Sequence, residues 1–60
     1  MDDAMKRFIE SNRLELVTCI LKAVPNMEAP DDEGIEDWIN NDESLYDWAM
    51  IDGAIEENGH

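Results

Sequence analysis

The side chains of this sequence that could do chemistry are concentrated in residues 31–52. Nine carboxylates lie there beside two tryptophans, with no lysine or arginine among them. Clustered carboxylates can hold calcium, or two of them can act as an acid–base pair in catalysis. Their spacing decides whether either chemistry is supported.

The spacing does not fit a calcium loop. An EF-hand loop needs oxygen ligands at positions 1, 3, 5 and 12 and a glycine at position 6. With Asp31 at position 1, Ile35 falls at position 5, and with Asp32 at position 1, Gly34 falls at position 3. A loop built on the next glycine would need Trp48 as its first ligand. We therefore predict no metal and no other cofactor, and interpret the acidic run as the solvated first turn of a helix. A loose, low-affinity divalent site at Asp31-Asp32-Glu33 is the alternative interpretation.

Nothing in the sequence indicates an enzyme. Sixteen carboxylates make some close pair inevitable, and acid–base catalysis also needs a cleft that raises one pKa and excludes water. Catalysis by Cys19 would need a nearby base, yet the single histidine is His60. Cys19 instead falls on an apolar stripe, where we expect a small buried hydrophobe. No catalytic residue is predicted.

The formal net charge of −12 is unevenly distributed. Residues 1–22 carry four acidic and four basic side chains, whereas residues 23–60 carry twelve acidic side chains and no lysine or arginine. Such a half repels nucleic acid and anionic membranes and attracts basic surfaces. Direct binding to nucleic acid requires a basic footprint. The expected partner is therefore a basic nucleic-acid-binding protein or a ribonucleoprotein complex.

Sixty residues predict a single small domain, residues 1–60, of marginal stability. One cysteine and one histidine can build neither a disulfide nor a zinc site within the chain. The unpaired cysteine favours a reducing compartment. The acidic start and the lack of a membrane-length apolar run argue against a signal peptide or a span, so we expect a cytoplasmic protein. Apolar residues at helical spacing favour a chain that folds alone, the alternative being folding on a partner or as a homodimer.

The first half predicts one long helix over residues 3–24, started by Asp2 or Asp3 and stopped by Pro25. Leu14, Val17, Leu21 and Val24 widen its apolar arc, so we expect the second half of the helix to be the more buried. Its main apolar stripe has i, i+3, i+4 spacing and comprises Met5, Phe8, Ile9, Leu16, Cys19, Ile20 and Ala23.

The polar residue Asn12 interrupts this stripe. A break at Ser11-Asn12 would resolve the conflict, with Asn12 capping a second helix and Glu15 closing a capping box. It would also shorten a helix that would otherwise be about 33 Å long. The alternation in residues 13–20 leaves a strand as the rival interpretation.

A proline-bounded connector, residues 25–30, precedes two short helices. The first, about 31–40, is capped by Asp31 or Asp32, and the second, about 43–52, is capped by Asp42. Gly53 suits the left-handed position after the second helix, and residues 53–60 read as a loosely packed tail. The predicted fold is all-α, a small bundle of one long N-terminal helix, open to a break, and two short acidic helices. Their inward faces comprise Ile35, Trp38 and Ile39 in the first helix and Leu45, Trp48, Ala49 and Ile51 in the second.

The acidic side chains fall on the outward faces of these short helices. Tyr46 and Met50 fall beside them, so we expect a mixed acidic and apolar contact surface, with Trp38 and Trp48 in the core rather than serving as anchors for a partner. The predicted partner-binding residues are Glu33, Glu36, Asp37, Asp42, Glu43, Tyr46, Asp47, Met50 and Glu57.

In size, charge and lack of catalytic residues the whole chain resembles the small acidic inhibitors encoded by phages and mobile elements, which include anti-CRISPR proteins and other DNA mimics. That group contains all-α, mixed and all-β folds. The resemblance implies a target in the bacterial cytoplasm and an inhibitor that blocks the access of nucleic acid to it. Since no sequence motif carries the resemblance, it assigns no role to any residue.

Two other functions fit the same residues. A helical adaptor or dimerisation module could pair the stripe Phe8-Ile9-Leu16-Ile20 with a partner helix, the acid serving only solubility. An acidic neutraliser of a basic toxin, similar to an antitoxin, would make the same use of charge as the inhibitor.

Overall fold

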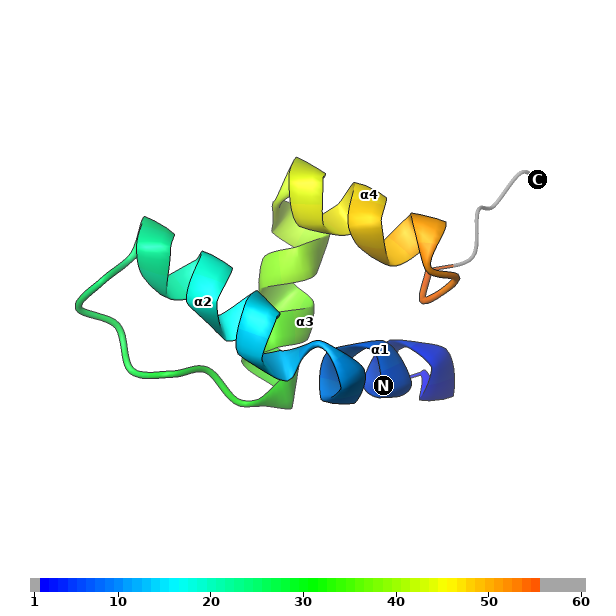
Figure 1. The fold of residues 1–60 in the computed structure, drawn as a ribbon, viewed down its shortest axis with the longest axis horizontal. Coiled ribbons are helices and arrows are strands. Elements are labelled where there is room, and N and C mark those ends of the chain that lie inside the picture. Colours follow the sequence, from blue (N-terminus) through cyan, green and yellow to red (C-terminus); the bar gives the residue numbers. More distant parts are fainter. Residues whose placement is uncertain (1, 56–60) are drawn as a thin grey trace.

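The computed structural model describes residues 2–55, and within them the chain forms four α-helices and no strands. These are α1 (Asp3–Ser11), α2 (Arg13–Ala23), α3 (Asp32–Asn41) and α4 (Glu43–Ile51). α1 and α2 follow one another along the long axis, α3 crosses them near their junction, and α4 returns beside α1 (Figure 1). The all-α prediction is confirmed, but the long N-terminal helix is two helices.

The core lies where α3 crosses the other helices. Ile9, Leu16, Ile20, Ile35 and Ile39 are fully buried there, and burying one such side chain contributes about 1.5–3 kcal/mol. The rings of Phe8 and Trp48 meet edge to face with centroids 5.0 Å apart, which joins the first helix to the last. Met5, Phe8, Leu45, Ala49 and Ala54 complete the buried set.

Asn12 separates α1 from α2, as the alternative interpretation predicted, but it does not cap α2 through its side chain. Its backbone lies at φ −123° and ψ 21°, outside the extended region that N-cap residues usually adopt. The side chain therefore turns back, and its Nδ2 donates to the Phe8 carbonyl at 2.9 Å. The predicted N-cap is wrong, because Asn12 serves the end of α1. Residues 13–20 are helical, which removes the strand alternative.

The second half of the predicted long helix is not the more buried part. Leu14 is 82% exposed and Val24 is 38% exposed, and Cys19 and Ala23 are exposed as well. α2 packs against α1 and α3, which cover only the side that carries Leu16 and Ile20. We predicted that these four side chains would be buried, and that prediction is wrong.

The predicted caps of the two acidic helices are confirmed. Asp31 Oδ1 accepts from the Gly34 N–H at 2.9 Å, and Asp42 Oδ1 accepts from the Leu45 N–H at 3.1 Å. A Cβ at Gly34 would lie 3.0 Å from Pro30 Cβ and 3.3 Å from Asp31 Oδ1, so a side chain there would crowd the turn that carries the Asp31 cap. Asp2 occupies the N-cap of α1 without a side-chain hydrogen bond.

α4 ends in a Schellman motif at the predicted glycine. Gly53 has φ +81° and donates to the Met50 carbonyl at 3.0 Å, while Ala54 donates to the Ala49 carbonyl at 2.8 Å. Ala54 is thereby buried against the core and Ile55 packs on it, so the predicted loose tail is wrong at these two residues. The rest of that tail, residues 56–60, lies outside the described residues.

Ile51 was expected in the core of α4 but is 83% exposed. It follows the buried Ala49 by two residues, which is about 200° around a helix at 3.6 residues per turn. Leu45 and Ala49, four residues apart, form the buried side instead. Ile51 therefore belongs to the outer side of α4.

Candidate functional site

The acidic side chains of residues 31–52 lie at the surface, as predicted. None of the nine, all within the described part of the chain, is buried. Four of the predicted site residues, Glu33, Asp37, Glu43 and Asp47, are exposed, and Glu36 and Asp42 are half-buried. The whole acidic run of α3 and α4 is thus accessible from solvent.

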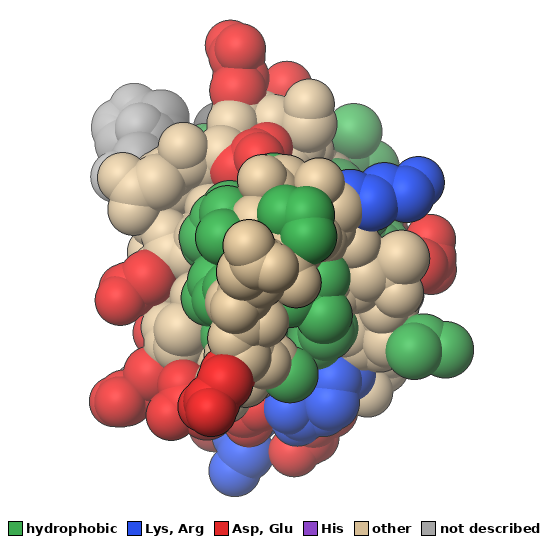
Figure 2. All heavy atoms as spheres, turned by 90° about the vertical axis from the view of Figure 1, so that its left-hand side faces the viewer, with side chains coloured by type: hydrophobic (Ala, Val, Ile, Leu, Met, Phe, Trp, Pro, Cys, Tyr) green, Lys and Arg blue, Asp and Glu red, His purple; other side chains and the backbone are tan. Residues whose placement is uncertain are grey.

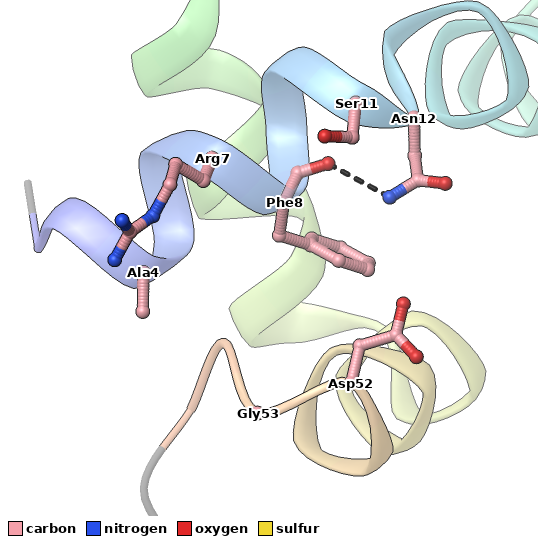
Figure 3. A pocket seen from close by; sticks show the side chains of 7 residues that line it. All are labelled: Ala4, Arg7, Phe8, Ser11, Asn12, Asp52 and Gly53. Atoms are coloured by element: carbon pink, nitrogen blue, oxygen red, sulfur yellow. Dashed lines mark hydrogen bonds between the residues drawn. The ribbon is translucent and has the colours of Figure 1, made fainter.

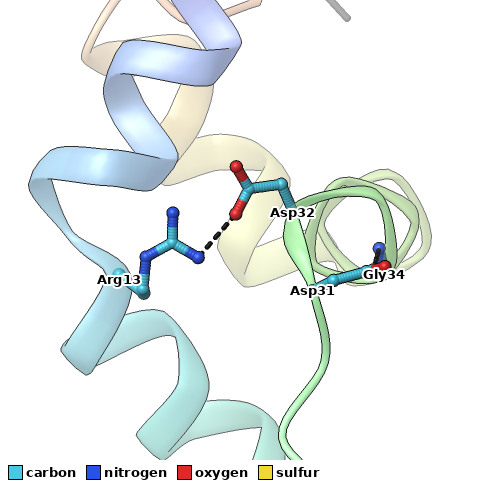
Figure 4. Close-up of polar contacts among 4 residues, drawn as sticks. All are labelled: Arg13, Asp31, Asp32 and Gly34. Atoms are coloured by element: carbon cyan, nitrogen blue, oxygen red, sulfur yellow. Dashed lines mark hydrogen bonds and ion pairs between the residues drawn. The ribbon is translucent and has the colours of Figure 1, made fainter.

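One of the nine carboxylates is neutralised by an ion pair within residues 2–55. Arg13 Nη1 donates to Asp32 Oδ1 at 2.5 Å, which joins the start of α2 to the start of α3 (Figure 4). Chiefly through this hydrogen bond, the pKa of Asp32 is lowered and the pKa of Arg13 is raised. Both side chains remain partly exposed, so water screens the pair.

The predicted apolar part of the site is less exposed than expected. Tyr46 and Met50 are half-buried on α4. Their role in a partner contact stays a prediction. Glu57 lies outside the described residues.

A hollow on one side of α3 brings two of the predicted residues together. Its volume is about 320 Å³, and we call it the α3 notch; it is lined by Gly34, Asp37, Trp38, Asn41 and Asp42. Trp38 was expected in the core and is half-buried, packing on the core while lining the notch. Charge alone identified Asp37 and Asp42.

Sequence reasoning missed the other three residues of the α3 notch. Gly34, Trp38 and Asn41 are spaced by four and three residues, which places them on one side of a helix. A glycine one turn before a tryptophan has no side chain that could cover the indole. This spacing is the signal that could have revealed the notch.

The free polar atoms of the α3 notch are hydrogen-bond acceptors. Asn41 Nδ2 donates a hydrogen bond to the Asp37 carbonyl at 2.7 Å, which leaves Asn41 Oδ1 available as an acceptor. Asp42 uses Oδ1 to cap α4, so its second oxygen and both oxygens of Asp37 remain free. Within residues 2–55 no basic side chain forms an ion pair with either carboxylate. The notch combines unneutralised negative charge with an aromatic ring.

A second hollow, of about 350 Å³, separates α1 from the end of α4 (Figure 3). The Asp52 carboxylate points toward Phe8, whereas the Arg7 side chain extends toward Ala4. The lining thus carries one basic and one acidic side chain, so charge of neither sign is concentrated in this hollow. The complete lining is Ala4, Arg7, Phe8, Ser11, Asn12, Asp52 and Gly53.

The outer side of α2 is an apolar surface that the sequence did not distinguish from the core. Leu14 and Val24 are exposed and Val17 and Leu21 are half-buried, Val17 because it also packs against the core; we call these four residues the α2 stripe. Figure 2 views the end of the molecule formed by α2 and the connector, and hydrophobic side chains gather in the middle of it. The helical spacing of the α2 stripe alone could not show which side of α2 the other helices cover.

Residues 2–55 contain no group of three or more histidine, cysteine, aspartate or glutamate side chains placed to hold a metal ion. Within the same residues, no helix has the length and apolar character needed to cross a bilayer. Comparison with known proteins finds no family, curated protein or solved structure that matches the chain. Function therefore has to be inferred from the chemistry of the surface.

Proposed function

We propose that this chain is an acidic inhibitor protein that blocks the basic nucleic-acid-binding surface of a bacterial cytoplasmic protein or ribonucleoprotein complex. The observation that carries the proposal is the unneutralised charge of α3 and α4. Nine carboxylates in residues 31–52 lie at the surface without one lysine or arginine among them, and Asp32 has the one ion pair found within residues 2–55.

The amount of charge suits competition with DNA. Duplex DNA carries one charge per about 1.7 Å of axis, so nine carboxylates match about 15 Å of duplex. α3 has ten residues and is about 15 Å long, and α4 has nine and is about 14 Å long, so the acidic helices can present this charge over a comparable length. A solubility role calls for a net charge of only about 2–8 in a small domain, less than the −12 of this chain.

A surface of this kind would act as a DNA mimic, in the manner of anti-CRISPR inhibitors. Long-range attraction speeds the encounter with a basic groove, and the apolar side chains beside the carboxylates then favour one groove over others. The inhibitor needs no catalytic residue, because occupying the groove excludes the nucleic acid.

The test is capture of partners from a bacterial lysate at low and high salt, with the retained proteins identified by mass. Charge reversal should abolish capture while the helical circular dichroism survives, because the acids form no part of the core. The reversed variant replaces with lysine Glu36, Asp37, Glu43 and Asp47.

A control variant carries the same change in charge on the other elements. Its four carboxylates are exposed and lie outside α3 and α4, so capture should persist. Retained capture by the α3–α4 variant would contradict the inhibitor. A captured toxin would instead identify the chain as an antitoxin-like neutraliser. The control replaces with lysine Asp2, Glu10, Glu15 and Glu28.

The adaptor is a second candidate, but through a different surface. The stripe first considered for it, Phe8-Ile9-Leu16-Ile20, is buried in the chain's own core. The α2 stripe is the apolar surface that remains, with Leu14 82% exposed. Sedimentation over a range of protein and salt concentrations separates the candidates. Self-association that resists salt supports the adaptor, whereas a partner complex weakened by salt supports the inhibitor.

A further inference from the structure

We infer that the α3 notch receives the side chain of one arginine from the basic partner. This inference rests on the proposed function and adds to it the residue type that the partner inserts. The acidic surface would then provide attraction at long range, and the notch would fix the register of the two surfaces at short range.

The first support is the shape of the notch. Its volume of about 320 Å³ lies at the lower end of the roughly 300–1,000 Å³ of ligand sites, which suits a single side chain. Gly34 contributes no side chain to fill it, and the half-buried Trp38 is one of the residues that line it. A cation placed on an indole face is attracted by its quadrupole.

The second support is charge complementarity. Asp37 and Asp42 stand on either side of Trp38 in the sequence and line the same hollow, with no ion pair of their own within the described residues. Asn41 adds an acceptor, because its amide donor is bonded to the Asp37 carbonyl. The notch therefore matches an occupant that is positively charged and rich in donors.

Arginine fits these groups better than lysine. Its planar guanidinium carries five donors in a fixed fork, stacks on aromatic faces and is weakly hydrated. A lysine ammonium is a compact, strongly hydrated point charge that gains less from the indole. A divalent metal ion fits less well still, because no group of three potential metal ligands occurs in residues 2–55.

Two short basic peptides of equal length and charge test the inference on the intact chain. One has a single arginine in an otherwise lysine sequence, and the other contains lysine only. Binding is followed at moderate salt through the NMR signal of the Trp38 indole N–H, assigned with Trp38→Phe. We expect the arginine peptide to bind about fivefold more tightly and to shift the Trp38 signal more than the Trp48 signal.

Two matched variants locate the binding. Asp37→Asn and Asp47→Asn remove the same charge from exposed positions on neighbouring helices, but only Asp37 lines the notch. We expect the arginine peptide to lose about fivefold in affinity with Asp37→Asn and less than about twofold with Asp47→Asn. Trp38→Leu should abolish the preference for arginine, and its circular dichroism shows whether the helices survive.

Equal affinity for the two peptides would overturn the inference. Equal losses from Asp37→Asn and Asp47→Asn would overturn it too, because attraction would then be diffuse, a result that leaves the inhibitor standing. Failure of the inhibitor appears separately, as lysate capture that survives reversal of the α3–α4 charges.

Discussion

The helix pair α1–α2 and the helix pair α3–α4 reach their structures in different ways. α3 and α4 each begin at an aspartate whose carboxylate accepts a backbone N–H, and α4 ends at a glycine of positive φ. α1 and α2 begin without a side-chain cap. In residues 1–22 the acidic and basic side chains balance, whereas residues 31–52 carry nine carboxylates and no lysine or arginine.

The difference shows which half depends on its neighbours. Local signals define where α3 and α4 start and stop, so their acidic sides are set by the chain itself. The apolar pattern of residues 3–24 is continuous, yet the structure divides it into two helices at Asn12 and buries only one side of α2. The limits and the buried side of α1 and α2 therefore depend on the elements that pack on them. The proposed function follows the same division, because it assigns the display of charge to the half that is locally determined.

The largest expected effect separates the two sides of α2. Leu16→Ala should lower the free energy of unfolding by about 2–5 kcal/mol, because Leu16 is fully buried. Leu14→Ala should change it by no more than about 0.5 kcal/mol, because Leu14 is 82% exposed. Urea unfolding followed by circular dichroism measures both. Similar losses from the two variants would mean that α2 is covered on both sides.

Removing an N-cap aspartate should cost stability at the start of α3 or α4 but little at the start of α1. Asp31→Ala and Asp42→Ala should each lower the free energy of unfolding by about 0.5–2 kcal/mol, because each leaves a backbone N–H without its partner. Asp2→Ala should have less effect, since Asp2 makes no side-chain cap bond. Thermal unfolding compares the three. Asp31→Asn and Asp42→Asn are the controls, because asparagine keeps the cap and removes the charge.

Gly53→Ala should lower the free energy of unfolding by about 1 kcal/mol. A Cβ at this position would meet no atom within 4 Å, so the loss comes from the φ of +81° alone. Gly53→Asn should recover part of it, because asparagine tolerates the left-handed region. Chemical unfolding of the two variants beside the parent measures this. Equal stability of Gly53→Ala and the parent would show that the end of α4 is not set locally.

The smallest expected effect concerns the one ion pair between the halves within residues 2–55. The Asp32 pKa is lowered from its ordinary value of 3.8, mainly by the hydrogen bond from Arg13. A lowered pKa means that the pair stabilises the fold above the unfolded-state pKa, near 4, and that this stability is lost as pH falls through the folded-state pKa. An NMR titration of the Asp32 carboxyl should show its pKa rising in Arg13→Gln. An unchanged pKa would mean that the pair does not persist in solution.

Sequence reasoning predicted what local chemistry determines. Preferences that act within a few residues of the chain account for the caps at Asp31 and Asp42, the turn at Gly53 and the outward carboxylates. The side of α2 that is buried depends on where α3 crosses, which no local pattern encodes. Of the α3 notch, charge revealed two carboxylates, and the indole between them was assigned wholly to the core.

Asp42 belongs both to the start of α4 and to the α3 notch. Its Oδ1 accepts a hydrogen bond from the Leu45 N–H, while the same side chain lines the α3 notch. We therefore expect a contact with this carboxylate to affect the first turn of α4. The exchange of the Leu45 amide hydrogen with solvent should slow when an occupant of the notch fixes the carboxylate and quicken in Asp42→Ala. One backbone amide thus reports, from inside the fold, on events at the surface.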